Sequence, residues 1–186
     1  IAVTGSHGKT TTTSMIAVLL DCAGLDPTMV IGGRIAALGG NAKLGSSELM
    51  VVEGDESDRS FLQLSPVIAV VTGIDREHLE AYSNIEDLTD TFVDFVNKVP
   101  FYGASILCVD DARIREVLQR IRRRYVTYGF SSNADISADN VILDGSNSRF
   151  ELKLKGKTVG PIELQIPGRV NVLNSLAAIG AGCELG

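Results

Sequence analysis

The sequence has no tryptophan, few aromatic residues and no long apolar run. Aromatic residues make up 5% of its 186 residues, whereas glycine occurs 19 times. Proteins that stack nucleic-acid bases on their side chains need more aromatic rings, so we expect no nucleic-acid partner. No apolar run approaches the roughly 20 residues that a membrane-spanning helix needs, so we also expect no membrane insertion.

Positive charge is scarce as well. The formal net charge is −6, which disfavours nonspecific binding to DNA, RNA or an anionic membrane. One basic cluster interrupts this pattern, and we interpret it as the solvated end of a helix rather than a nucleic-acid patch: Arg120, Arg122, Arg123 and Arg124.

The three cysteines are far apart and lie among apolar residues: Cys22, Cys108 and Cys183. No C-x-x-C pair is present, so a metal site of thiolates is not indicated. We therefore expect buried, reduced thiols in a cytoplasmic protein.

The size and the ends of the chain suggest one domain taken from a longer protein. With 45% hydrophobic residues, 186 residues are enough for one globular domain with a real core. The chain starts at Ile1, without a methionine, inside an expected strand, and it ends in or just after an expected helix. We expect it to be an excised piece.

Apolar runs alternate with helical patterns along the chain. The runs at 1–4, 28–33, 48–55, 66–75 and 104–111 are mostly continuous, which is typical of parallel strands buried on both faces. Helical spacing follows at 10–25, 83–99 and 111–121, and Ser83 and Glu86 form a possible capping box. This alternation predicts an α/β fold with a P-loop-type, doubly wound, mostly parallel sheet.

Residues 135–166 have a different pattern, in which apolar and polar residues alternate. Residues 144–148, with the sequence DGSNS, supply a hairpin turn. We expect a small antiparallel sheet over 135–166, attached to the main sheet, and then a return to a helix at 167–182.

The stretch VTGSHGKTTTT, residues 3–13, lies between the first strand and the first helix. The usual P-loop spacing would require a glycine where this chain has Val3. Gly5 and Gly8 would still let the backbone approach a phosphate, while Lys9 would neutralise its charge and Thr10 would bind Mg²⁺. The alternative is a glycine turn followed by an ordinary helix cap.

Acidic residues follow the strand at 48–55: Glu53, Asp55, Glu56 and Asp58. Open α/β sheets bind ligands at the carboxyl ends of their strands, and Mg²⁺ prefers oxygen ligands. Gathering four acids is costly unless positive charge lies among them. They could instead form a solvated acidic turn.

Two histidines occur, and both follow expected strands. His78 comes after the strand at 66–75, near Asp75 and Glu77, and could be either a functional side chain or a surface one. His7 lies inside the glycine loop, where we expect it to shape the loop. Asn171 and Asn174 share one face of the last expected helix and could read a purine edge or cap the helix.

Taken together, these motifs resemble the Mur ligases, which join amino acids to the peptidoglycan precursor. The family's phosphate loop has the form G-x-x-G-K-[ST]-[ST], and GSHGKTT at 5–11 fits it. The stretches EGDESDRSF, TGIDREHLEAY, VPFYG, CVDD and PGRVNVLNSLAA are similar to the family in the same order. The resemblance covers only the central, ATP-binding domain and implies that the UDP-binding N-terminal domain and the C-terminal domain are absent.

The resemblance also implies roles for residues. Lys9 would contact phosphate, Thr10 and Glu53 would hold one Mg²⁺, and His78 would bind a second Mg²⁺. The family commonly has a histidine directly before the first asparagine, whereas this chain has Val170. The contact with adenine that the histidine makes in the family is therefore not expected here. The remaining residues expected to bind ATP are Gly5, Ser6, His7, Gly8, Thr11, Asn171 and Asn174.

The implied reaction joins UDP-N-acetylmuramate to L-alanine through an acyl phosphate, with ATP and Mg²⁺. Other functions remain open at this point. These are an amide ligase of the same superfamily that adds a peptide or a glutamate, a P-loop NTPase that drives movement, and an inactive nucleotide-binding module.

Overall fold

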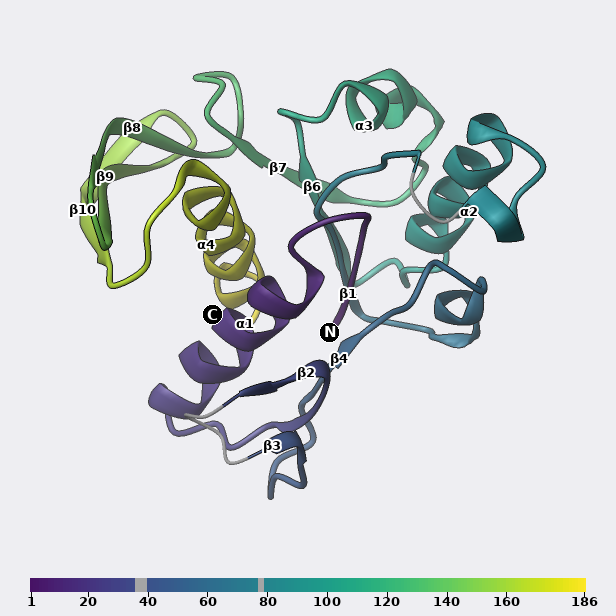
Figure 1. Cartoon of the computed structure of the whole chain (residues 1–186), viewed down its shortest axis with the longest axis horizontal. Coiled ribbons are helices and arrows are strands. Elements are labelled where there is room, and N and C mark those ends of the chain that lie inside the picture. Colours follow the sequence, from purple (N-terminus) through teal and green to yellow (C-terminus); the bar gives the residue numbers. More distant parts are fainter. Residues whose placement is uncertain (36–39, 77–78) are drawn as a thin grey trace.

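The computed structural model describes residues 1–35, 40–76 and 79–186 (Figure 1). The strands are β1 (Ala2–Thr4), β2 (Thr28–Ile35), β3 (Gly40–Lys43), β4 (Met50–Glu53), β5 (Ile68–Val71), β6 (Ala104–Cys108), β7 (Tyr125–Gly129), β8 (Ile136–Asp144), β9 (Asn147–Leu154) and β10 (Lys157–Leu164). The α-helices are α1 (Lys9–Cys22), α2 (Ile85–Asn97), α3 (Ala112–Val117) and α4 (Arg169–Cys183). Short 3-10 helices are η2 (Ser60–Gln63), η3 (Leu79–Ala81) and η4 (Leu118–Arg120).

The ten strands of the described residues belong to one hydrogen-bonded sheet in the order β10-β9-β8-β7-β6-β5-β1-β4-β2-β3. In sheet order, the neighbouring strands β2, β4, β1, β5, β6, β7 and β8 all pair in parallel. The sheet ends in antiparallel strands, with β8–β10 at one edge and β3 at the other. This arrangement confirms the predicted α/β fold and its mostly parallel sheet, whereas the pairing of β3 with β2 was not predicted.

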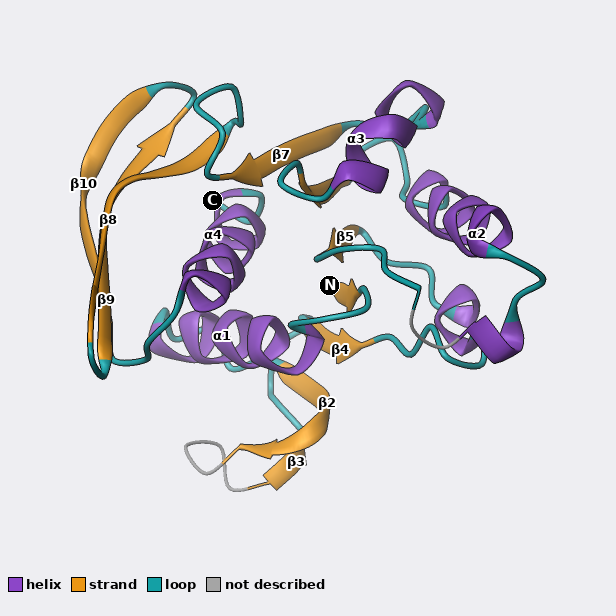
Figure 2. Cartoon of the chain, turned by 45° about the horizontal axis from the view of Figure 1, so that its top comes forward, coloured by secondary structure: helices purple, strands orange, loops and turns teal. Residues whose placement is uncertain are grey.

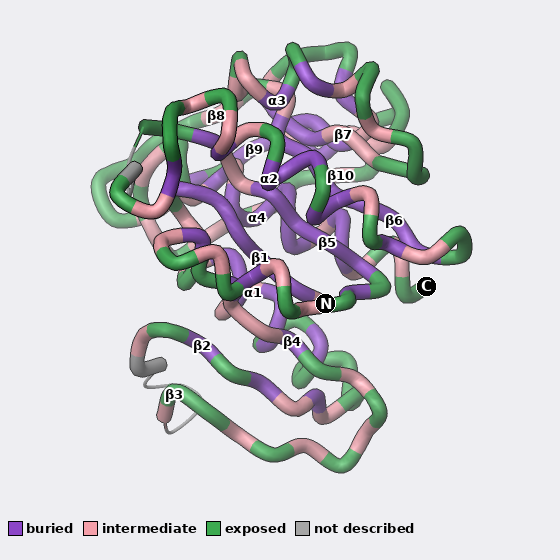
Figure 3. The backbone as a smooth tube through the Cα atoms, turned by 90° about the vertical axis from the view of Figure 1, so that its right-hand side faces the viewer, coloured by how far each residue is buried: buried purple, intermediate pink, exposed green. Residues whose placement is uncertain are grey.

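Helices cover both faces of the parallel part of the sheet. Helices α1 and α4 contact each other on one face, and α2 and α3 lie on the other (Figures 1 and 2). The central strands β1 and β5 are buried along their whole length, as Figure 3 shows. Their continuous apolar sequences follow from this two-sided covering.

The antiparallel strands β8–β10 extend the sheet beyond α4 (Figure 1). Strand β8 joins the parallel part through Tyr128, which pairs with Ile136, and the turn between β8 and β9 contains Gly145 at φ 51°. Helix α4 contacts both β8 and β9. The predicted hairpin turn is therefore present in this region.

Helix α2 starts one residue later than the expected capping box implies. Asn84 is the N-cap, and its side-chain oxygen accepts a hydrogen bond of 2.8 Å from the backbone N–H of Asp87. The prediction of Ser83 and Glu86 was wrong, because Asn84 is an equally good cap and brings Asp87 to the third position of the helix.

The cysteine prediction was only partly correct. Cys108 is buried in β6, and burial raises the pKa of its thiol. Cys22 and Cys183, each the last residue of a helix, are exposed. Among the residues that the structure describes, no helix is long and apolar enough to cross a membrane.

Candidate functional site

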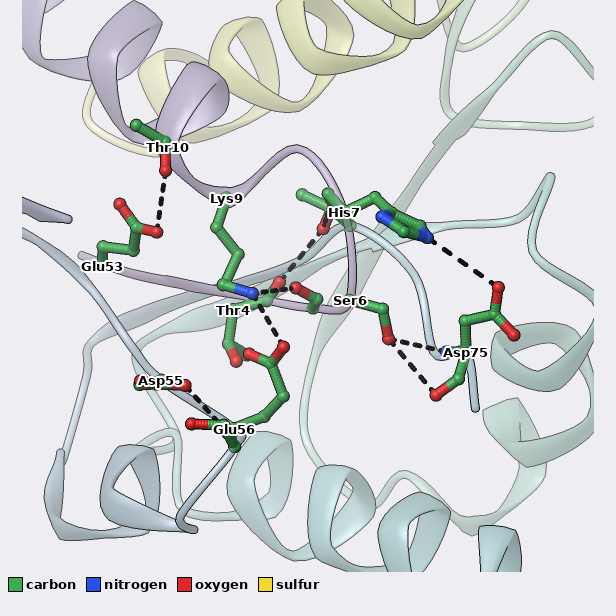
Figure 4. A network of polar contacts seen from close by, with 12 residues as sticks. Thr4, Ser6, His7, Lys9, Thr10, Glu53, Asp55, Glu56 and Asp75 are labelled. Atoms are coloured by element: carbon green, nitrogen blue, oxygen red, sulfur yellow. Dashed lines mark hydrogen bonds and ion pairs between the residues drawn. The ribbon is translucent and has the colours of Figure 1, made fainter. Parts of the chain in front are cut away.

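The carboxyl ends of β4, β1 and β5 lie side by side, since these three strands are neighbours in the sheet. The loop at residues 5–8 follows β1 and turns back to begin α1 (Figure 4). Gly5 has φ 127°, and a Cβ there would come within 2.4 Å of Thr72 Oγ1. Gly8 has φ 81°, so both glycines are required by conformation as well as by space.

The first turn of α1 is open to an anion. Its N-cap is Gly8, no side chain caps it, and its first turn holds no acidic residue. The hydroxyl of Thr13 donates a hydrogen bond of 2.8 Å to the Lys9 carbonyl, so it is directed away from the free N–H groups of the first turn. Thr11 also lies in this first turn. A helix N-terminus with free N–H groups and an adjacent lysine favours phosphate binding.

Lys9 lies along this loop rather than extending into solvent. Its ammonium donates to the Gly5 carbonyl at 2.8 Å and to Glu56 Oε1 at 2.7 Å (Figure 4). The Lys9 side chain is 16% exposed and that of Glu56 is 1% exposed. The positive charge that the acidic loop requires is therefore supplied by Lys9.

Thr10 and Glu53 come together at the end of β4. The Thr10 hydroxyl donates to Glu53 Oε1 at 2.9 Å, and the N–H of Gly32 donates to Glu53 Oε2 at 2.8 Å. One carboxylate and one hydroxyl beside a phosphate loop are the oxygen donors that Mg²⁺ takes together with phosphate and water. The described residues include no group of three or more His, Cys, Asp or Glu side chains suited to a metal.

The other two acids of this loop stabilise the loop itself. Asp55 accepts a hydrogen bond of 2.9 Å from the N–H of Ser57, and Asp58 accepts one of 2.8 Å from the N–H of Ser60. The Ser60 hydroxyl and N–H lower the pKa of Asp58. Of the four acids noted in the sequence, Glu53 and Glu56 therefore contact the phosphate loop.

Ser6 and His7 connect the phosphate loop to the segment after β5. Ser6 donates its N–H to the Gly73 carbonyl at 3.0 Å, and its hydroxyl accepts from the N–H of Asp75 at 2.7 Å. His7 Nε2 lies 3.8 Å from Asp75 Oδ2. These contacts support the expectation that His7 shapes the loop. His78 lies outside the described residues.

Asn174 reaches the same loop from α4. It is 4% exposed, and its Oδ1 would be 2.5 Å from a Cβ on Gly8. Its Nδ2 donates to Asn171 Oδ1 at 3.3 Å, and Asn171 Nδ2 donates to the Pro167 carbonyl at 2.7 Å. Val170 is 61% exposed beside this pair.

Sequence reasoning missed three residues that hold the site. Gly32 binds Glu53 through its backbone, and Thr72 donates its hydroxyl to the His7 carbonyl. The Tyr82 hydroxyl donates to the Glu56 carbonyl at 2.5 Å, and burial raises the pKa of Tyr82 to about 12. In each of these bonds the donor or the acceptor is a backbone group, so the pattern of side chains in the sequence does not reveal it.

Residues 3–182 match the family model described as the Mur ligase middle domain. The chain belongs to this family. A curated relative named UDP-N-acetylmuramate–L-alanine ligase, from Geobacter sulfurreducens, is 54% identical over 186 residues, which cover 100% of this chain and 40% of the relative. A relative of the same name from Pelobacter propionicus is 55% identical with the same coverage.

Solved Mur ligases have the same fold as this chain. The crystal structure of UDP-N-acetylmuramate–alanine ligase from Thermotoga maritima is 28% identical, with a TM-score of 0.87 over 100% of this chain and 41% of that one. The UDP-N-acetylmuramate:L-alanyl-γ-D-glutamyl-meso-diaminopimelate ligase from Neisseria meningitides is 27% identical, with a TM-score of 0.88 over 100% of this chain and 61% of that one. The chain thus spans about 40% of the length of the curated relatives that it matches.

Proposed function

We propose that this chain is the ATP-binding central domain of a ligase that joins UDP-N-acetylmuramate to L-alanine in peptidoglycan synthesis. The observation that carries the proposal is the convergence of Lys9, Thr10 and Glu53 at the start of α1. The names of relatives that are 54–55% identical to the chain support the choice of substrates. Flanking UDP-binding and C-terminal domains, and a cytoplasmic location, are part of the same proposal.

The reaction has two covalent steps. A carboxylate oxygen of UDP-N-acetylmuramate attacks the γ-phosphorus of ATP, and ADP leaves as the acyl phosphate forms. The amine of L-alanine then attacks the acyl carbon, loses a proton, and expels inorganic phosphate as the amide bond forms. Because phosphoryl transfer depends on positioning and charge stabilisation, the contribution of this domain is to hold and neutralise the phosphates.

Each proposed ligand has a physical reason. Free N–H groups at Gly8 and in the first turn of α1 would bind phosphate oxygens, and Lys9 would offset their charge. Thr10 and Glu53 would hold Mg²⁺, which supplies further neutralisation when bound. His78 is proposed as a ligand of a second Mg²⁺, on the family resemblance alone.

Asn171 and Asn174 are the proposed nucleotide contacts on α4. Asn174 is buried against Gly8, so it would act at the phosphate loop as well as toward the base. Asn171 is the more exposed of the two and would be free to turn its amide toward adenine once the Pro167 hydrogen bond is released.

The proposal is tested by measuring phosphate release from ATP with a full-length ligase that contains this chain. Release should require both UDP-N-acetylmuramate and L-alanine, and the tripeptide L-alanyl-γ-D-glutamyl-meso-diaminopimelate should not replace L-alanine. Lys9→Ala should reduce turnover by at least about 100-fold, as expected for the loss of a charge that stabilises the transition state.

The matched control is Lys157→Ala, which removes an exposed lysine on β10. It should leave turnover unchanged. Near-normal turnover by Lys9→Ala would refute the assignment of the phosphate loop. Preference for the tripeptide would refute the substrate assignment while keeping the phosphate loop.

A further inference from the structure

Lys9 is paired with a buried carboxylate that has no role in the proposed reaction so far. Glu56 is 1% exposed, and its Oε1 accepts a hydrogen bond of 2.7 Å from the Lys9 ammonium. Its second oxygen, Oε2, is buried and has no hydrogen-bond partner within the described part of the chain. Lys9 is therefore the group that compensates the charge of Glu56.

Glu56 is fixed in place by its own backbone. The Tyr82 hydroxyl donates to the Glu56 carbonyl at 2.5 Å, and the Arg59 guanidinium lies 4.5 Å from the centre of the Tyr82 ring. Arg59 also donates to the Ala81 carbonyl at 2.9 Å, which ties the acidic loop to η3. These contacts hold the Glu56 backbone in the acidic loop, so only its side chain could follow Lys9 if the lysine moved outward.

Two arrangements are conceivable when phosphate arrives. In the first, Lys9 leaves Glu56 and binds phosphate alone, which leaves a buried carboxylate without a partner and is strongly unfavourable. In the second, Lys9 keeps its bonds to Glu56 and Gly5. An ammonium has three N–H donors, and these bonds use two, so the third remains available. The second arrangement carries no desolvation penalty for Glu56.

We propose that Glu56 is a positioning residue that holds the Lys9 ammonium against the loop so that its remaining N–H donates to a phosphate of the bound nucleotide. This inference rests on the proposed function, because it assumes that the loop binds a nucleoside triphosphate. Glu56 acts only through Lys9 and touches no reacting atom. A glutamine at this position keeps the oxygen that accepts the hydrogen bond, whereas alanine removes it.

The test is a set of Mg·ATP titrations by calorimetry with a full-length ligase that contains this chain, using Glu56→Ala, Glu56→Gln, Lys9→Ala and the double variant Lys9→Ala/Glu56→Ala. Circular dichroism before each titration verifies that the variants are folded. Glu56→Ala should weaken binding by about tenfold, roughly the effect of one lost charged contact, and Glu56→Gln by less than about threefold. In the Lys9→Ala background, Glu56→Ala should weaken binding no further.

Asp58→Asn is the matched control, since Asp58 lies in the same loop and accepts its hydrogen bonds from Ser60 rather than from Lys9. It should bind as the wild type does. Equal weakening by Glu56→Ala in both backgrounds would show a structural role for Glu56 and overturn the inference. Tighter binding by Glu56→Ala or Glu56→Gln would show that Glu56 competes with phosphate, which also overturns it.

Failure of the inference differs from failure of the proposed function. If Lys9→Ala weakens binding and Glu56→Ala does not, only the role of Glu56 is refuted. If the full-length wild-type ligase does not bind Mg·ATP, or Lys9→Ala binds as well as the wild type, both are refuted.

Discussion

The side-chain oxygen of Asn174 lies directly above Gly8, so close that a Cβ on Gly8 would come within 2.5 Å of it. The two residues are far apart in the sequence and belong to α4 and to the N-cap of α1. Close packing of α1 against α4 thus determines the space available at the phosphate loop. Glycine is required at position 8 both for its left-handed backbone and for this contact.

Gly8→Ala should therefore abolish tight nucleotide binding. The added methyl group strains a residue at φ 81° and displaces Asn174, so we expect at least a tenfold loss of Mg·ATP affinity and about 1–2 kcal/mol of stability. Calorimetric titration and urea unfolding measure the two effects. Gly145→Ala is the control, because Gly145 has φ 51° with nothing within 4 Å of the added Cβ.

The control should lose stability through backbone strain and keep its affinity for Mg·ATP. If Gly8→Ala binds as well as Gly145→Ala does, the loop at residues 5–8 is not the phosphate site.

Glu53→Gln should remove most of the benefit that Mg²⁺ gives to nucleotide binding. The amide has no charge to offer the cation, although it can still accept the hydrogen bond from Thr10. We expect the ratio of ATP affinity with Mg²⁺ to affinity with EDTA to fall by about tenfold. Asp55→Asn, in the same loop but bonded to Ser57, should keep the wild-type ratio. An unchanged ratio in Glu53→Gln would rule out Glu53 as a metal ligand.

The alternation of strands and helices up to β6 could be predicted because most of those strands carry a continuous apolar run, whereas β7, with the mixed sequence YVTYG, was not predicted. Val3 in β1 and Val70 in β5 are both fully buried, and Val70 lies between the apolar residues Ala69 and Val71. The meeting of Lys9, Thr10 and Glu53 could also be anticipated, since carboxyl ends of neighbouring parallel strands share one edge.

Other features depend on tertiary contacts that leave no local pattern. The strand at 40–43 has the sequence GNAK, which is not apolar. Only its antiparallel pairing with β2 identifies it as a strand. Asn84 and Ser83 are both good caps, so the sequence alone did not decide between them. The partner of Lys9 could not be chosen among the four acids, because the path of residues 54–58 decides which one turns inward.

The three cysteines should differ sharply in their reaction with an alkylating agent. Cys22 and Cys183 are exposed and should react in the native chain, Cys183 more slowly because burial raises the pKa of its thiol, whereas buried Cys108 should react only after unfolding. The raised pKa of Cys108 disfavours its thiolate further. Mass spectrometry after a timed reaction with iodoacetamide counts the modified sites. Rapid native labelling of Cys108 would contradict its position in β6.

Asp26 should make stability depend on pH in the acidic range. Its carboxylate accepts from the Lys43 ammonium and from the hydroxyl and N–H of Ser46, which lower its pKa from 3.8 to about 2. A carboxyl whose pKa is lower in the folded state stabilises the fold above its unfolded pKa, and this stabilisation disappears as pH falls through the folded pKa.

The difference in free energy of unfolding between the wild type and Asp26→Asn should therefore be constant above about pH 5, then shrink steadily toward pH 2. Urea unfolding at several pH values measures it. Lys43→Met removes the first cause of the lowered pKa, so in that background the difference should be smaller and should vary less with pH. A difference that stays constant down to pH 2 would mean that Asp26 does not hold the segment before β2 to the segment after β3.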